Sequence, residues 1–163
     1  EGFYKDMIKA IFTAFILMGV VVFIAFRNFI PSLAVILSAL LDISATLMIV
    51  NFLEIKISTA GIAAFLLVIG YSVDTDILMT TKVLKRVEGG STMERLISSA
   101  KTGLTMTAST FVALSVGYFV AGSLILKQMF LIILIALIVD IISTYGMNAG
   151  ILYWYKEGRK SKS

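Results

Sequence analysis

The run ISTAGIAAFLLVIGYSVDTD at residues 57–76 decides the fold of this chain. Its apolar part, from Ile57 to Ile69, leads without a break into GYSVDTD at residues 70–76, which carries two carboxylates. An intramembrane carboxylate costs about 2.5–3.5 kcal/mol on insertion scales, so such groups face protein or water rather than lipid. We therefore expect a polar seam inside a bundle of membrane helices.

The bulk composition indicates a membrane protein. Of the 163 residues, 59% are hydrophobic and 15% are charged, and the mean hydropathy is +0.99. Soluble domains are about 45–50% apolar and about 25% charged. The chain contains no Cys and no His, which excludes a disulfide framework, a thiolate metal site and a Ser–His protease. We expect no enzymatic activity, no cofactor, no metal and no nucleic-acid partner.

Five apolar stretches are long enough to cross a bilayer, which takes about 20 helical residues. The alternating pattern of a membrane β-barrel is absent, so the predicted fold class is all-α, a polytopic bundle of five transmembrane helices. Pro31 is predicted at the first position of the second helix. Residues 1–163 form one transmembrane domain, with spans at about 7–26, 31–52, 58–80, 102–122 and 128–155, a segment at 81–101 and a tail at 156–163.

The segment between the third and fourth spans contains a helix start signal. Ser91 and Glu94 are spaced as the two members of a capping box, after a Gly89-Gly90 break. We expect a short cytoplasmic amphipathic helix from Thr92 to about Lys101, lying at the lipid headgroups.

The basic residues predict the orientation. With five spans, ten Lys and Arg residues fall on one side and four on the other. The positive-inside rule makes the first side cytoplasmic, so residue 1 lies outside and the C-terminus inside. A chain that starts outside leads us to expect at least one further span upstream. The four outside residues are Lys5, Lys9, Lys56 and Lys127.

Polar residues recur at four-residue spacing, which places them on one helix face. In the third span Asp74 shares a face with Gly70, whereas Asp76 lies about 200° away, with Ser72. The first span has no such row and is predicted to face lipid. The rows in the other spans are Ser38, Asp42 and Thr46; Lys101, Thr105 and Ser109; and Asp140, Thr144 and Asn148.

An acid held between burial and a nearby cation can take up and release a proton, because the two influences oppose each other. The candidates for a proton relay are Asp74 first, Asp42 next, then Asp76, with Lys101 close to the third-span acids. Asp140 can instead serve as a structural link between helices, as any of these acids can, and Asp76 can instead face water at the inner rim.

Small residues predict close helix packing in the later spans. Gly117 is flanked by Ala113 and Ala121 at four-residue spacing, and Gly146 with Gly150 forms a GxxxG motif. Gly70 adds a small residue on the Asp74 face.

The run at residues 70–76 resembles the fourth-helix motif of the SecD/SecF family of protein-export membrane proteins, within the resistance-nodulation-division (RND) superfamily. Gly70-Tyr71-Ser72 favours the SecF branch, and Asp74-Thr75-Asp76 with Lys101 is similar to the archaeal pattern. The other matches occur in the family's order: Leu41-Asp42-Ile43, Leu53-Glu54, Ser98-Ser99-Ala100-Lys101-Thr102 and Ser143-Thr144-Tyr145.

The resemblance implies helices two to six of a six-helix fold whose external domain lies between the first and second helices. It also implies a cell-membrane location and three partners besides lipid: SecD, the SecYEG channel and the translocating polypeptide, with proton flow as a driving force. The alternatives are a scaffold subunit for SecD, half of another proton-driven RND transporter, or an intramembrane aspartyl protease using Asp42 and Asp74, although the motifs of the last class are absent.

Overall fold

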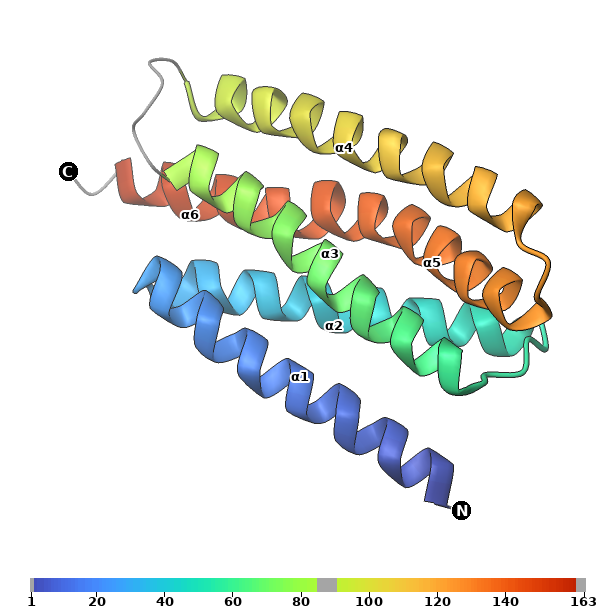
Figure 1. Cartoon of the computed structure of the whole chain (residues 1–163). Coiled ribbons are helices and arrows are strands. Elements are labelled where there is room, and N and C mark those ends of the chain that lie inside the picture. Colours follow the sequence, from blue (N-terminus) through green and yellow to red (C-terminus); the bar gives the residue numbers. More distant parts are fainter. Residues whose placement is uncertain (1, 85–90, 161–163) are drawn as a thin grey trace.

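The computed structural model describes residues 2–84 and 91–160, and nearly all of them are helical (Figure 1). Five of the described helical stretches are long and apolar enough to cross a membrane, which confirms the all-α membrane fold class. The fifth stretch is built from three consecutive elements. The elements are α1 (Gly2–Phe26), α2 (Phe29–Phe52), α3 (Thr59–Leu84), α4 (Thr92–Val120), α5 (Leu124–Ile142), the π-helix η1 (Ser143–Asn148) and α6 (Ala149–Lys160).

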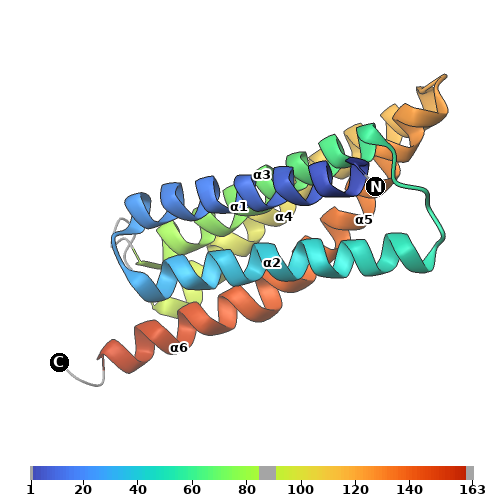
Figure 2. The same ribbon diagram turned by 90° about the horizontal axis from the view of Figure 1, so that it is seen from below.

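Helix α3 is the central element of the bundle. It packs against α1, α2, α4 and α5, whereas α1 lies at one edge and α4 at the opposite edge (Figure 1). Helices α2 and α6 run beside each other along one face (Figure 2). The run of residues 57–76 therefore lies in the helix that has the most neighbours.

Three apolar clusters hold α3 in place. Phe65 packs with Val50 of α2 and Leu137 of α5 in one cluster. Ile69 packs with Val22 of α1 and Val35 of α2 in a second. The third joins the last turns of α3 to α4 and α6 through Met79, Val83, Leu96 and Leu152. Because lipid tails are as apolar as these side chains, close packing rather than water exclusion is what favours such contacts in a bilayer.

Several helix boundaries differ from the sequence expectation, including the start of α2 and the end of α3. Helix α2 begins at Phe29, so Pro31 is its third residue, where the missing N–H would have no partner within the helix in any case. Helix α3 continues to Leu84, which places Asp74 about 15 Å from that end at 1.5 Å per residue. Asp74 is thus close to mid-span.

The capping box predicted at the start of α4 is confirmed. The Ser91 hydroxyl accepts a hydrogen bond from the Glu94 backbone N–H at 3.2 Å, and the Glu94 carboxylate accepts one from the Ser91 N–H at 2.8 Å. The short helix expected at residues 92–101 is not a separate element. It forms the first turns of α4, which runs unbroken from Thr92 to Val120 because no residue in this range breaks the helix.

Candidate functional site

Three buried aspartates meet where α2, α3 and the end of α5 converge. Asp42, Asp76 and Asp140 have exposed fractions of 0%, 0% and 1%. Each lies within electrostatic reach of the other two. We call these three residues the carboxylate cluster.

Asp42 joins three segments of the chain. Ser72 of α3 donates a hydrogen bond to one of its carboxylate oxygens, and Ser143 of η1 donates one to the other. Ser38, one turn before Asp42, lies with its hydroxyl 3.3 Å from the Ser143 hydroxyl. Both oxygens of Asp42 are therefore partnered, and the residue cross-links α2, α3 and η1.

Asp76 and Asp140 are only partly satisfied. Asn148 Nδ2 donates to Asp76 Oδ1 at 2.6 Å, and Thr144 Oγ1 donates to Asp140 Oδ1 at 3.3 Å. Within the described part of the chain, the Oδ2 atoms of both aspartates are buried and receive no hydrogen bond of good geometry, although the Ser38 hydroxyl lies near Asp76 and the Ser72 hydroxyl near Asp140. A buried acceptor without a partner costs about 1–3 kcal/mol, more when it is charged. These two oxygens therefore carry the cost of burial without a hydrogen bond.

No lysine or arginine of the described residues donates a hydrogen bond to the carboxylate cluster. In residues 2–84 and 91–160 the hydrogen-bond donors to the three carboxylates are hydroxyls and an amide, with no lysine or arginine among them. Burying three carboxylates close together without a compensating cation is unfavourable while they are charged. The described acidic residues form no group of three with metal-binding geometry.

A π-helix completes the site. Residues 143–148 form η1, with Ser143, Thr144 and Asn148 all buried. Because a π-turn takes more residues than an α-turn, each residue rotates the chain by less, and Asn148 stays closer to the Ser143 face than it would in an α-helix. Such turns often occur at functional sites. No feature of the sequence predicted this element.

The predicted polar rows have different locations. Those of the second and fifth spans are buried together: Ser38, Asp42 and Thr46 with Asp140, Thr144 and Asn148. The fourth-span row of Lys101, Thr105 and Ser109 is exposed instead. The hydroxyls of Thr105 and Ser109 donate to the backbone carbonyls of Lys101 and Thr105, at 2.8 and 2.9 Å, and so need no neighbouring helix.

In the third span the structure separates the two acids. Asp74 is exposed, whereas Asp76 lies in the cluster. Asp76 belongs to a row that the sequence analysis did not single out: Ser72, Asp76 and Thr80 are four residues apart and all buried. The same spacing rule that identified the other rows would have found it.

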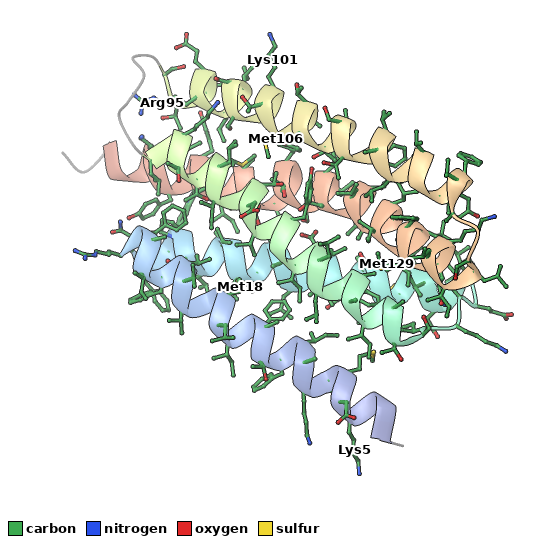
Figure 3. All side chains as sticks on the ribbon, viewed as in Figure 1. Lys5, Met18, Arg95, Lys101, Met106 and Met129 are labelled. Carbon is green, nitrogen blue, oxygen red and sulfur yellow. The ribbon has the colours of Figure 1, made fainter. Side chains whose placement is uncertain are left out.

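Lys101 does not reach the carboxylate cluster. It projects from the outer edge of α4, away from the bundle (Figure 3). Lys82 makes the lysine contact between α3 and α4, with its Nζ donating to Thr102 Oγ1 at 2.9 Å.

Of the glycines predicted at helix contacts, Gly117 packs closely: a Cβ there would lie 3.0–3.3 Å from the Phe130 ring. A Cβ at Gly70, Gly146 or Gly150 would have no heavy atom within 4 Å in the described structure. Among the described glycines, Gly103 lies closest to another side chain, because a Cβ there would meet the Tyr145 hydroxyl. The sequence did not mark this glycine.

Five membrane-spanning helices around buried carboxylates define a multi-pass membrane protein with an acidic interior. The family described as "Protein export membrane protein SecD/SecF, C-terminal" matches residues 1–158. The chain belongs to this SecD/SecF family.

Among its relatives are archaeal proteins named protein-export membrane protein SecF. That of Methanocaldococcus jannaschii is 47% identical over 158 residues, covering 94% of this chain and 56% of the relative. That of Methanolacinia petrolearia is 42% identical over 161 residues, covering 96% and 56%. That of Methanothermobacter thermautotrophicus is 43% identical over 155 residues, covering 92% and 54%. The chain thus spans about half the length of these relatives.

Proposed function

We propose that this chain forms the membrane-embedded part of a SecF-type subunit that promotes polypeptide translocation together with SecD, beside the SecYEG channel. In this proposal proton binding and release at the carboxylate cluster supply the coupling. The observation that carries it is the burial of Asp42, Asp76 and Asp140 without a lysine or arginine donor among the described residues. Membership of the protein-export family supports the export role.

Asp76 is the proposed proton carrier. It has a buried oxygen without a described partner, whereas both oxygens of Asp42 are bonded. Thr80, one turn closer to the Leu84 end, offers a second buried hydroxyl without a described partner. A proton that moves between Asp76 and the Leu84 end along this face of α3 would pass Thr80. Asp140 is near enough for its charge to respond to that of Asp76.

The export test uses the full-length protein with Asp76→Asn, because Asn retains size and hydrogen bonding but cannot release a proton. We expect normal insertion with export reduced at least tenfold. Asp74→Asn is the comparison, since it makes the same change two residues away on the exposed face. Normal export by Asp76→Asn would overturn the coupling role, and failure of Asp74→Asn alone, with SecD still bound, would transfer that role to Asp74.

A scaffold role has one specific observation in its favour, the cross-link that Asp42 makes between α2, α3 and η1. Under that role Asp42→Asn would lower the amount of folded protein while the surviving protein exported normally per molecule. Under the coupling role it would be folded and inactive.

The proposed orientation places the Leu84 end of α3 in the cytoplasm. The turn containing Arg27, the Thr92 end of α4 and the C-terminal end of α6 lie at this same end of the bundle (Figure 1). Arg27, Lys82, Arg95 and Lys101 belong to these segments, as the positive-inside rule requires of a cytoplasmic end.

The exposed face of α3 that carries Asp74 is the proposed contact surface for SecD. Gly70, one turn earlier, leaves open space beside this carboxylate, so another helix could approach closely. A mid-span carboxylate facing lipid is unfavourable, and a partner helix with a hydrogen-bond donor or a cation at that depth would relieve the cost.

Cysteine cross-linking tests this surface, and residues 1–163 contain no Cys that would interfere. Gly70→Cys is expected to form disulfides with single cysteines placed along SecD helices. Val20→Cys on the exposed side of α1 is the matched control and should form none. Equal cross-linking from both positions would contradict the assignment.

A further inference from the structure

Asp76 and Asn148 are paired across the bundle although 72 positions separate them in the chain. Asn148 Nδ2 donates to Asp76 Oδ1 at 2.6 Å, and both residues are fully buried. This contact ties the centre of α3 to the last residue of η1.

The two other polar atoms of this pair have the same chemical character when Asp76 is ionised. Asp76 Oδ2 and Asn148 Oδ1 are both acceptors, and both are buried without a hydrogen-bond partner among the described residues. Each therefore bears the cost of a buried acceptor that is not satisfied.

One proton changes this balance. A proton on Asp76 Oδ2 converts that atom into a donor, while Asn148 Oδ1 remains an acceptor on the neighbouring planar group. The terminal torsions of Asp and Asn are broad, so the two planar groups can turn to face each other. They then make two parallel hydrogen bonds, N–H to the acid carbonyl and O–H to the amide carbonyl.

We propose that Asn148 is a positioning residue that holds Asp76 as a protonated, doubly hydrogen-bonded acid–amide pair. The proton comes from water and bonds to Asp76 Oδ2; its return to water breaks the O–H bond and restores the carboxylate. The inference deepens the role proposed for Asp76 in coupling, and it assigns a function to η1, which turns Asn148 toward α3. The titratable groups that face Asp76 are Asp42 of α2, Asp140 of α5 and Tyr145 of η1.

The test is infrared difference spectroscopy between neutral and alkaline pH on the full-length protein in lipid vesicles. The wild type should give a carboxylic-acid C=O band that Asp76→Asn removes. In Asn148→Leu this band should shift to higher frequency, because the acid carbonyl loses its donor and the O–H loses its acceptor. Asn51→Leu makes the same substitution at an exposed position of α2 and should leave the band in place.

Two results would overturn the pairing: the absence of an Asp76-dependent acid band at neutral pH, or an unshifted band in Asn148→Leu. If the leucine variant does not fold, the wild-type frequency decides. A band typical of a doubly hydrogen-bonded acid supports the pair, and one typical of a free acid contradicts it. The spectrum does not depend on export, so an intact pair together with normal export by Asp76→Asn would refute only the coupling role.

Discussion

The Tyr145 hydroxyl lies against the backbone of Gly103, where α4 passes η1. A Cβ at residue 103 would be 2.1 Å from this hydroxyl and 3.6 Å from Thr75 Cγ2. We predict that Gly103→Ala lowers the free energy of unfolding by about 1–3 kcal/mol, because the added methyl group must displace packed atoms. Thermal unfolding in detergent would measure the loss.

The clash comes mainly from one atom, so a second substitution should rescue the first. In Gly103→Ala/Tyr145→Phe the nearest ring carbon would lie 3.4 Å away, an ordinary contact. Tyr145→Phe alone should cost little, because the hydroxyl has no hydrogen-bond partner in the described structure. A double variant as unstable as Gly103→Ala would show that the strain lies elsewhere.

The two serines that donate to Asp42 should each contribute to stability. Ser72→Ala or Ser143→Ala leaves one Asp42 oxygen without a donor and should cost about 1–3 kcal/mol in the free energy of unfolding. Denaturant unfolding in mixed micelles would measure the effect. Ser44→Ala, at an exposed position of α2, is the control and should change stability by less than about 0.5 kcal/mol.

Asp74 is exposed and Asp76 is buried, so the two carboxyl groups should also differ in chemical reactivity. A carboxyl-reactive label can modify only the carboxyl groups that it can reach, so the isolated protein should be labelled at Asp74 and not at Asp42 or Asp76. Mass spectrometry of the labelled peptides would locate the adduct. Added SecD should suppress labelling several-fold if it covers this face, and persistent labelling in the complex would contradict that contact.

Replacement of two glycines by alanine should change the stability of the chain in opposite directions. Gly150→Ala adds a methyl group in open space inside α6 and should stabilise the isolated chain by about 0.5–1 kcal/mol through helix propensity. Gly117→Ala presses on the Phe130 ring at 3.0–3.3 Å and should destabilise it. Thermal unfolding of both variants under one condition provides the comparison, and a shift of the same sign in both would refute it.

The sequence predicted five membrane-spanning helices because crossing a bilayer imposes a length and a hydropathy that few other structures share. It also predicted the capping box, which depends only on local spacing. It was harder to predict which polar residues face the interior of the bundle. Hydroxyl groups can donate hydrogen bonds to the backbone of their own helix, so a polar row needs no neighbouring helix. The Lys101 row therefore has the same spacing as the Asp42 row, yet it is exposed whereas the Asp42 row is buried.

The choice between Asp74 and Asp76 rested on which face of α3 meets its neighbours. Gly70 suggested a packed face, whereas the structure leaves that face open and buries the Ser72, Asp76 and Thr80 row instead. Tertiary packing decides this choice, and the motif at residues 70–76 contains polar residues on both faces. The π-turn was equally hidden, because no residue type marks it.

The π-turn has a consequence for the length of the chain. Deleting one residue from a membrane helix normally rotates everything after it by about 100°, so that buried side chains turn toward lipid. At η1 the wide turn already contains one residue more than an α-turn needs. A single deletion between residues 143 and 148 could therefore be absorbed by a return to α-geometry, with Leu152 still facing Met79 and Val83. This segment is where the fifth span can change in length without losing its register.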